Sequence, residues 1–205
     1  LELARREYDA AVITGRVPIF VGGTGYYINA IINGISPMPD VCAANRARAR
    51  DMVAADIDAA RKLLPDDFAA TDPQRIARAL EVFFETGRHL AEFQSLPRTG
   101  AIVPTPHRIL INPDPDVLRA RIVARIPKML AGGAVDEAQA IIDAGLNENR
   151  AIGAAVLCQM LRGQITNDEC IAKWITQTNQ YAKRQRTWFR TQFVADTEIN
   201  DAYLV

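Results

Sequence analysis

The sequence predicts an α/β fold that is mostly helical, in which a core is interrupted by an all-helical insertion. Residues 17–21 form a short apolar run that ends in Gly22-Gly23-Thr24-Gly25 and passes into a helical pattern. A second short apolar run occupies residues 109–111, and most other segments show helical spacing. Strand, glycine turn and helix in that order are typical of α/β proteins. The core is expected over residues 1–36 and 100–205, and the insertion over residues 37–99.

The first part of the core supplies one expected strand and one expected helix. Residues 1–6 have the pattern of a helix interior without an N-cap, so we expect the natural polypeptide to begin upstream. Residues 17–21 predict a buried strand, and residues 26–32 predict a helix that ends at Gly34. Prolines and turn residues at 36–40 then predict a segment boundary. Two visible strands are too few for a stable open sheet, which also leads us to expect further strands upstream.

The insertion is predicted to be helical and rather polar. Asp72 and Pro73 are typical of a helix start, with the aspartate as N-cap and the proline at the first helical position. Gly87 is the expected end of that helix, and residues 96–100 form a second boundary. The apolar stripe of this helix comprises Ile76, Leu80, Phe83 and Phe84.

The remainder of the core begins with the strand at 109–111, which Asn112-Pro113-Asp114-Pro115 ends. Helical spacing dominates from there. Helices are expected over residues 116–131, 134–144, 151–161 and 167–192.

Composition excludes several classes of protein. Among the 205 residues, 49% are apolar and 23% are charged, which are ordinary globular values. The formal net charge is zero, so any affinity for nucleic acid must come from local patches. Three widely spaced cysteines and two histidines predict neither a zinc site nor a disulfide framework, and a reducing cytoplasm is the expected location. No apolar run reaches the ~18 residues that span a bilayer, and no signal peptide is recognisable.

The last expected helix carries the strongest local charge. Four cations lie within residues 183–190, interleaved with aromatic residues and glutamines. At about 100° per residue, Lys183, Arg186 and Arg190 share one flank beside an apolar stripe. Cations beside aromatic rings are typical of sites that hold phosphates and stack bases. The alternative is a solvated basic face on an ordinary amphipathic helix.

The loop formed by Gly22, Gly23, Thr24 and Gly25 lies where α/β folds usually bind ligands, between a strand and a helix N-terminus. Its backbone N–H groups favour an anion, and Thr24 adds a hydroxyl group. The alternative is a tight turn whose glycines permit close packing. The spacing and the missing lysine show that this loop is not a Walker A motif.

Arginines on two other helices are candidate anion ligands. Arg121 and Arg125 are four residues apart at the edge of an apolar face, so they either extend to solvent or meet an anion such as a diphosphate. Residues 74–78 open the main insertion helix, where the helix dipole favours a phosphate or base contact. Arg46, Arg48 and Arg50 alternate nearby, with ordinary surface charge as the alternative. No nucleophile–base pair can be assembled, which leaves positioning and anion stabilisation as the available chemistry.

Taken in order, these segments resemble the tRNA dimethylallyltransferase (tRNA isopentenyltransferase) family. Six stretches carry the resemblance and extend over nearly the whole chain. They are PIFVGGTGYY at 18–27, GISPMP at 34–39, DPQRIARALEV at 72–82 with TG at 86–87, RIVAR at 121–125 with ML at 129–130, RAIG at 150–153, and QYAKRQRTWFR at 180–190.

The resemblance implies transfer of a dimethylallyl group from dimethylallyl diphosphate to N6 of the adenine immediately 3′ of the anticodon. Thr24 would contact that adenine, which is expected to be flipped into a channel. Arg125, with Arg121, Gly22 and Gly23, would hold the diphosphate. The residues implied in tRNA binding are Thr24, Arg46, Gln74, Arg75, Ile76, Ala77, Arg78, Arg150, Gly153, Lys183, Arg184, Gln185, Arg186, Trp188 and Arg190. Residues 37–99 would be the domain that clamps the tRNA.

The resemblance further implies a P-loop-NTPase-like core of the nucleotide-binding (ATP-binding) type, Mg²⁺ carried by the diphosphate, and no organic cofactor. The partners are the tRNA anticodon stem-loop and dimethylallyl diphosphate; no membrane is expected, and the protein is expected to be a cytoplasmic monomer. The family's P-loop and general-base aspartate are not among these residues, so we expect this chain alone to bind tRNA better than it catalyses transfer. The residues leave two alternatives open: a non-catalytic RNA-binding module and a P-loop kinase relative acting on a small nucleotide.

Overall fold

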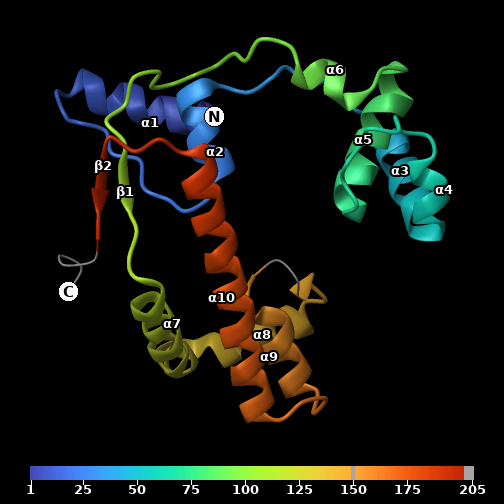
Figure 1. Cartoon of the computed structure of the whole chain (residues 1–205). Coiled ribbons are helices and arrows are strands. Elements are labelled where there is room, and N and C mark those ends of the chain that lie inside the picture. Colours follow the sequence, from blue (N-terminus) through green and yellow to red (C-terminus); the bar gives the residue numbers. More distant parts are fainter. Residues whose placement is uncertain (149–150, 201–205) are drawn as a thin grey trace. The chain divides into compact units, whose positions relative to one another are not determined.

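The protein is described by a computed structural model of residues 1–148 and 151–200, and these residues are mostly helical with a small parallel sheet (Figure 1). The chain divides into two compact units. The first unit comprises Leu1–Phe20 and Tyr26–Pro106, and the second comprises Val21–Gly25 and the chain from His107 onward. Within the described residues, no helix combines the length and the apolar character needed to cross a membrane.

The first unit begins with helix α1 (Glu2–Ile13) and continues, after an extended segment, into α2 (Gly25–Asn33). The helix expected at 26–32 is confirmed, but the strand expected at 17–21 is wrong: these residues form no strand, and Val21 is 91% exposed. A strand needs a neighbour for its backbone hydrogen bonds. Among the described residues, only β1 and β2 form a sheet, and neither pairs with this segment.

Gly34 ends α2 with φ of +74°, as expected from the sequence. A Cβ atom at this position would overlap the backbone of Thr99, so glycine also permits a close approach. Ile35 forms an antiparallel bridge with Thr99, and Ser36 Oγ donates to the carbonyl of Gln94 at 3.2 Å. The segments that enter and leave the next group of helices therefore run side by side (Figure 1).

That group contains α3 (Ala43–Ala55), α4 (Ile57–Arg61), α5 (Pro73–Thr86) and α6 (Leu90–Gln94). The expected ends of α5 are confirmed, because Asp72 caps its N-terminus and Gly87 follows it with φ of +69°. α3 and α5 pack along each other over a small apolar core. Its buried members are Ala49, Ala60, Leu64, Ile76, Ala79 and Leu80.

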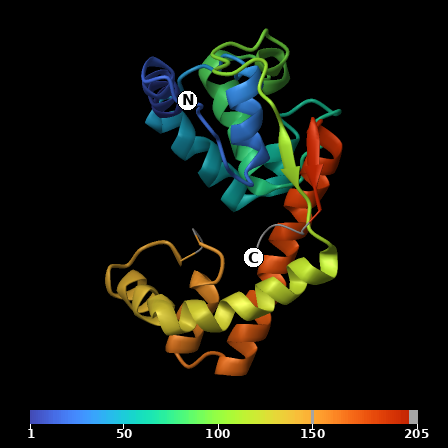
Figure 2. The same cartoon turned by 90° about the vertical axis from the view of Figure 1, so that its left-hand side faces the viewer.

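The sheet of the second unit consists of β1 (Ile109–Ile111) and β2 (Thr197–Ile199), which lie parallel with Leu110 opposite Glu198 (Figure 2). The strand expected at 109–111 is confirmed. β2 was not expected, because its three residues carry no extended alternation of apolar and polar side chains. Arg108 and Asp196 form an ion pair beside the first pair of residues in the sheet.

The helices of the second unit are α7 (Pro115–Met129), the π-helical turn η1 (Leu130–Ala134), α8 (Val135–Asp143), α9 (Ala154–Leu161) and α10 (Asn167–Gln192). All four expected helices are present with small shifts of their ends. Gly133 adopts φ of +100° within η1, which explains why one continuous helix does not extend from α7 into α8.

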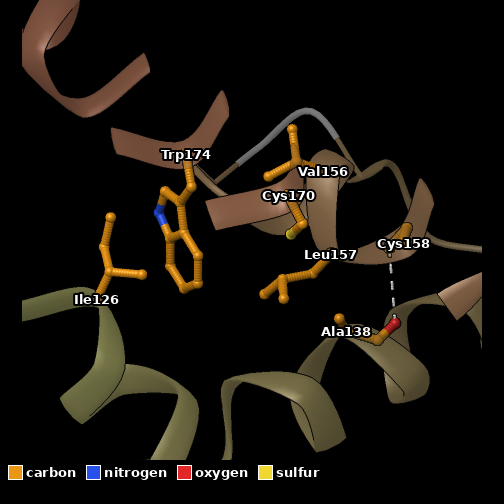
Figure 3. Close-up of a cluster of buried hydrophobic side chains, with 7 residues drawn as sticks. All are labelled: Ile126, Ala138, Val156, Leu157, Cys158, Cys170 and Trp174. Carbon is orange, nitrogen blue, oxygen red and sulfur yellow. Dashed lines mark hydrogen bonds between the residues drawn. The ribbon is translucent and has the colours of Figure 1, made fainter. Parts of the chain in front are cut away.

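α7, α8, α9 and α10 meet at one apolar core (Figure 3). Trp174 of α10 points toward Ile126 of α7. Two cysteines also lie in this core, and burial raises the pKa of the Cys158 and Cys170 thiols. Gly153, in the left-handed region with φ of +95°, lies where a Cβ atom would overlap the Trp174 ring. The buried members of the core are Ile126, Ala138, Val156, Leu157, Cys158, Cys170 and Trp174.

Candidate functional site

The glycine loop, residues Gly22-Gly23-Thr24-Gly25, lies against the C-terminal half of α10. The side-chain amide of Gln185 donates a hydrogen bond of 2.9 Å to the carbonyl of Gly23. A Cβ atom at Gly23 would overlap this amide, and one at Gly25 would overlap the Trp188 ring. The glycines of this loop stay outside the left-handed region of φ, so close approach rather than backbone torsion requires glycine at positions 23 and 25.

Thr24 is exposed between these two close contacts. Its neighbours Gly23 and Gly25 both meet side chains of α10, so the conformation on either side of Thr24 is restrained. A hydroxyl group can donate or accept a hydrogen bond. The loop therefore presents one polar side chain to solvent from a supported backbone.

α10 carries the basic residues as the sequence analysis expected. Lys183, Arg184 and Arg190 are exposed, whereas Arg186 is half-buried. The Arg184 guanidinium lies 5.7 Å from the centroid of the Tyr181 ring, which is within range of a cation–π contact. Aromatic residues continue this segment, because the Trp188 and Phe189 rings meet edge to face at a centroid distance of 5.0 Å. The segment thus combines accessible cations with aromatic rings.

Arg121 and Arg125 of α7 are both exposed. They flank Ile122 and Ile126, which are buried. This agrees with the expected position of Arg121 and Arg125 at the edge of an apolar face. Ile126 packs with Trp174 toward the N-terminal half of α10, whereas the glycine loop lies near Gln185 and Trp188. The helix that carries these arginines and the glycine loop therefore contact different halves of α10.

A second group of cations lies on α3 and α5, in the other compact unit. Its centre is Glu81, a carboxylate that is only 6% exposed. Arg78 donates to Glu81 at 3.0 Å, and Arg50 lies 3.6 Å from its second carboxylate oxygen. Buried charges are costly unless they are paired. Glu81 thus holds the arginines of two different helices against one anchor.

The remaining residues of this group differ in their accessibility. Arg46, Gln74 and Arg75 are exposed, whereas the side chains of Ile76 and Ala77 are buried in the protein interior. The backbone N–H of Arg75 donates to the Asp72 carboxylate at 3.0 Å. The side chains of Ile76 and Ala77 consequently offer no surface to a ligand, and any contact at the start of α5 involves its exposed side chains.

Two expected site residues from the 150–153 stretch have separate outcomes. Arg150 lies outside the described residues. Gly153 is buried at the N-cap of α9, directly against Trp174. Its backbone conformation and the overlap that a side chain would cause both explain a glycine at this position.

Sequence reasoning missed two features. Glu81 could have been noticed, because a charged residue one turn after Ala77 falls on the apolar face of α5. The contact between Gln185 and Gly23 joins residues 162 positions apart, and no local pattern indicates it. Among the described residues, no group of three or more histidines, cysteines or carboxylates could hold a metal ion.

Comparison with known proteins gives consistent matches. A family model described as IPP transferase matches residues 1–192. A tRNA dimethylallyltransferase of Rhizobium etli is 41% identical over 193 residues, which are 87% of this chain and 64% of that protein. One from Acidiphilium cryptum is 41% identical over 199 residues, covering 91% of this chain and 61% of that protein. The chain therefore spans a little under two thirds of the length of these curated relatives.

Solved structures also match. The full-length tRNA isopentenylpyrophosphate transferase of Bacillus halodurans superposes with a TM-score of 0.61 at 29% identity, covering 97% of this chain and 65% of that one. A tRNA delta(2)-isopentenylpyrophosphate transferase from Staphylococcus epidermidis gives a TM-score of 0.59 at 22% identity, covering 100% of this chain and 70% of that one. At the latter identity, the likeness concerns the fold alone.

Proposed function

The chain belongs to the IPP transferase family, and from this premise we propose that the protein transfers a dimethylallyl group from dimethylallyl diphosphate to N6 of the adenine immediately 3′ of the anticodon in tRNA. The observation that carries the proposal is the glycine loop, which presents exposed Thr24 while its neighbours rest on the basic and aromatic segment of α10. The names of the curated relatives support it too. They favour neither the RNA-binding module nor the kinase alternative.

In the proposed reaction, the N6 nitrogen of the adenine attacks C1 of the dimethylallyl group. A carbon–nitrogen bond forms, the bond from C1 to the diphosphate oxygen breaks so that diphosphate leaves, and one amine proton would pass to the general-base aspartate that the family resemblance implies and that is not among these residues. Thr24 would orient the amine through its hydroxyl group. Arg125, with Arg121 and the amides of Gly22 and Gly23, would stabilise the charge on the departing diphosphate.

Magnesium is proposed only as the companion of the diphosphate. The described residues offer no acidic cluster that would hold the ion on its own. Mg²⁺ is usually bound through substrate phosphates together with few protein carboxylates, so this is compatible with the donor set. The ion would neutralise part of the diphosphate charge.

The tRNA would be held by cations of both units. Arg46, Arg75 and Arg78 belong to the α3–α5 group, and the 183–190 segment adds Lys183, Arg184 and Arg190 to them. We assign residues 37–99 to a clamping domain and the rest to a P-loop-like core, supported by the paired entry and exit segments near Ile35 and Thr99. We also propose that the protein is a monomer and that it lies in the cytoplasm.

The test is binding of a fluorescently labelled anticodon stem-loop, measured by anisotropy, with adenine or another base at the position 3′ of the anticodon. Direct contact with the target base predicts that its replacement weakens binding by ~1–3 kcal/mol. Equal binding of both loops would overturn recognition of the target base and leave only contacts with the RNA backbone. Absence of binding to either loop would overturn the tRNA proposal itself.

A further inference from the structure

Gln185 and Trp188 lie within the basic segment of α10, yet their side chains meet the protein's own glycine loop. We propose that these two residues are positioning residues: they orient Thr24 by holding the glycine immediately before it and the glycine immediately after it, and they do not themselves contact RNA. This inference rests on the proposed function, in which Thr24 meets the target adenine. It separates Gln185 and Trp188 from the cations that surround them in the sequence.

The contact made by Gln185 is directional. Its amide nitrogen donates to the Gly23 carbonyl at 2.9 Å, and the side chain is half-buried. A hydrogen bond of this length fixes both the direction of the carbonyl and the plane of the peptide that links Gly23 to Thr24. Rotation of that peptide would turn Thr24 as well. Gln185 thereby restrains the residue immediately before Thr24.

The contact made by Trp188 is steric. Its indole ring lies where a side chain of Gly25 would be, and Gly25 is buried. The Trp188 ring also meets the Phe189 ring edge to face, which limits its freedom to move away. Gly25, the residue immediately after Thr24, therefore packs against the indole ring of Trp188, which Phe189 holds in place. Thr24 itself stays exposed between the two contacts.

The geometry of α10 separates this pair from the cationic flank. At about 100° per residue, Gln185 and Trp188 lie within about 60° of each other around the helix. The flank formed by Lys183, Arg186 and Arg190 is centred roughly half a turn away. One face of α10 thus supports the loop while another carries cations. A loss of Gln185 or Trp188 and a loss of a cation should have different consequences for RNA binding.

Gln185→Glu is the most conservative test, because it keeps the shape of the side chain but replaces its donor with an oxygen that repels the Gly23 carbonyl. The measurement is the ratio of the Kd for a stem-loop with purine at the target position, which lacks the exocyclic amine, to the Kd for the stem-loop with adenine there. We expect this ratio to fall about two- to tenfold, the equivalent of one hydrogen bond, while the affinity for the purine loop changes no more than it does in Gln180→Glu. Gln180→Glu makes the same charge change at an exposed position of α10 and should leave the ratio as in the wild type.

A double-mutant cycle tests the second contact. Gly25→Ala introduces an atom into the space of the Trp188 ring, and Trp188→Ala empties that space. If Trp188 acts through the loop, the two changes are coupled, and the double variant loses no more discrimination than the worse single variant. Additive losses would show that Trp188 acts independently of Gly25 and would overturn its assignment.

The outcomes distinguish this inference from the proposed function. If the wild-type chain binds both stem-loops equally, the proposed function fails, and the inference fails with it. If the wild type discriminates but Gln185→Glu keeps the wild-type ratio and weakens both loops more than Gln180→Glu does, Gln185 contacts RNA directly, and only the inference is overturned. A selective fall in the ratio, absent from Gln180→Glu, would support both.

Discussion

Gly23 and Gly25 illustrate how a single residue can be selected by its surroundings. Neither glycine adopts a positive φ, so an alanine would be acceptable to the backbone alone. The Gln185 amide and the Trp188 ring instead occupy the space that a methyl group would need. Two explanations weighed from the sequence, a ligand loop and a closely packed turn, are therefore compatible, because the packing is what supports exposed Thr24.

Asp196 leads to a prediction about pH. The backbone N–H and guanidinium of Arg108 donate to its carboxylate at 2.7–3.1 Å and lower the pKa of Asp196 from 3.8 to about 2. Because the folded pKa is depressed, the stabilising contribution is present above the ordinary pKa and is lost as pH falls toward about 2. The free energy of unfolding, measured in urea, should therefore be lower for Asp196→Asn than for wild type at pH 5.

The difference between the two proteins should narrow as the pH is lowered from 4 toward 2, since the wild-type carboxylate becomes protonated in that window. Asp116→Asn is a suitable comparison, because the Asp116–Arg119 pair is exposed and its distance is 3.4 Å. A gap that stays constant across the acidic range would contradict the assignment of Asp196.

Glu81 leads to a second prediction at the residue scale. Glu81→Gln keeps the shape of the side chain but removes the charge that faces Arg50 and Arg78. We expect the free energy of unfolding to fall by about 1–3 kcal/mol, because the glutamate is buried and its replacement turns one of the two acceptor oxygens into an N–H donor that faces an arginine.

The same substitution should weaken binding of the stem-loop, since Arg78 loses the contact that holds its guanidinium in place. Glu7→Gln is a matched control: both side chains of the Glu7–Arg6 pair are exposed, and its loss should change stability by less than about 0.5 kcal/mol. Equal effects of the two substitutions on unfolding in urea would show that Glu81 is not the anchor of this helix pair.

At the scale of elements, α10 supports three features at once: the apolar core through Trp174, the glycine loop through Gln185, and the cationic flank. A capping box begins this helix, in which Thr166 accepts from the backbone N–H of Glu169 at 3.2 Å and Glu169 accepts from the backbone N–H of Thr166 at 2.8 Å. Its first turn also carries Asp168, whose negative charge interacts favourably with the positive end of the helix dipole.

Thr166→Ala should therefore destabilise the protein by about 1 kcal/mol, the usual effect of removing an N-cap. Thermal unfolding followed by circular dichroism measures this effect. Thr176 provides the control, because it is exposed within α10 and its hydroxyl donates a hydrogen bond to the carbonyl of Ala172 in the same helix. Thr176→Ala should be neutral or slightly stabilising. If both variants behave alike, the capping box contributes nothing to α10.

The elements show which parts of the fold can be predicted from sequence. The ends of α5 were predictable, because Asp72, Pro73 and Gly87 act through local hydrogen bonds and torsions. The segment 17–21 was mispredicted, since an apolar run indicates a strand only where a neighbouring strand can pair with it. β2 was missed for the converse reason: three residues become a strand because β1 lies beside them.

In the candidate site, too, the features that depend on local sequence could be predicted and those that depend on tertiary contacts could not. The chemistry of its residues was predictable from type and spacing, as with exposed Thr24 and the cations of α10. The support of the site was not, because the partners of the glycine loop are 162 residues distant for Gly23 and 163 for Gly25, by subtraction of residue numbers. Burial of Ile76 and Ala77 also depends on tertiary packing. Domain boundaries and individual ligand contacts therefore stay predictions.

For the whole molecule, zero net charge determines how RNA binding should respond to salt. A neutral chain gains no general attraction for RNA, so the response must come from the few cations that touch phosphates. The slope of log affinity against log salt concentration should accordingly be modest and should depend on particular residues. Arg190→Gln, or Lys183→Gln, should reduce the magnitude of that slope by about 1 while leaving the preference for adenine intact.

The control for this prediction is a substitution of a cation that is already paired with a carboxylate. Arg6 donates to Glu7 at 2.8 Å on α1, and Arg6→Gln should leave the salt slope unchanged. Anisotropy titrations across a salt series compare the variants with Gln185→Glu, which should alter the base preference while changing the slope no more than Gln180→Glu does. If the cation variants changed the base preference, or if Arg6→Gln reduced the slope as much as they do, binding would not reside in the local patch of α10. The separation of slope from preference thus tests whether α10 uses different faces for holding RNA and for orienting Thr24.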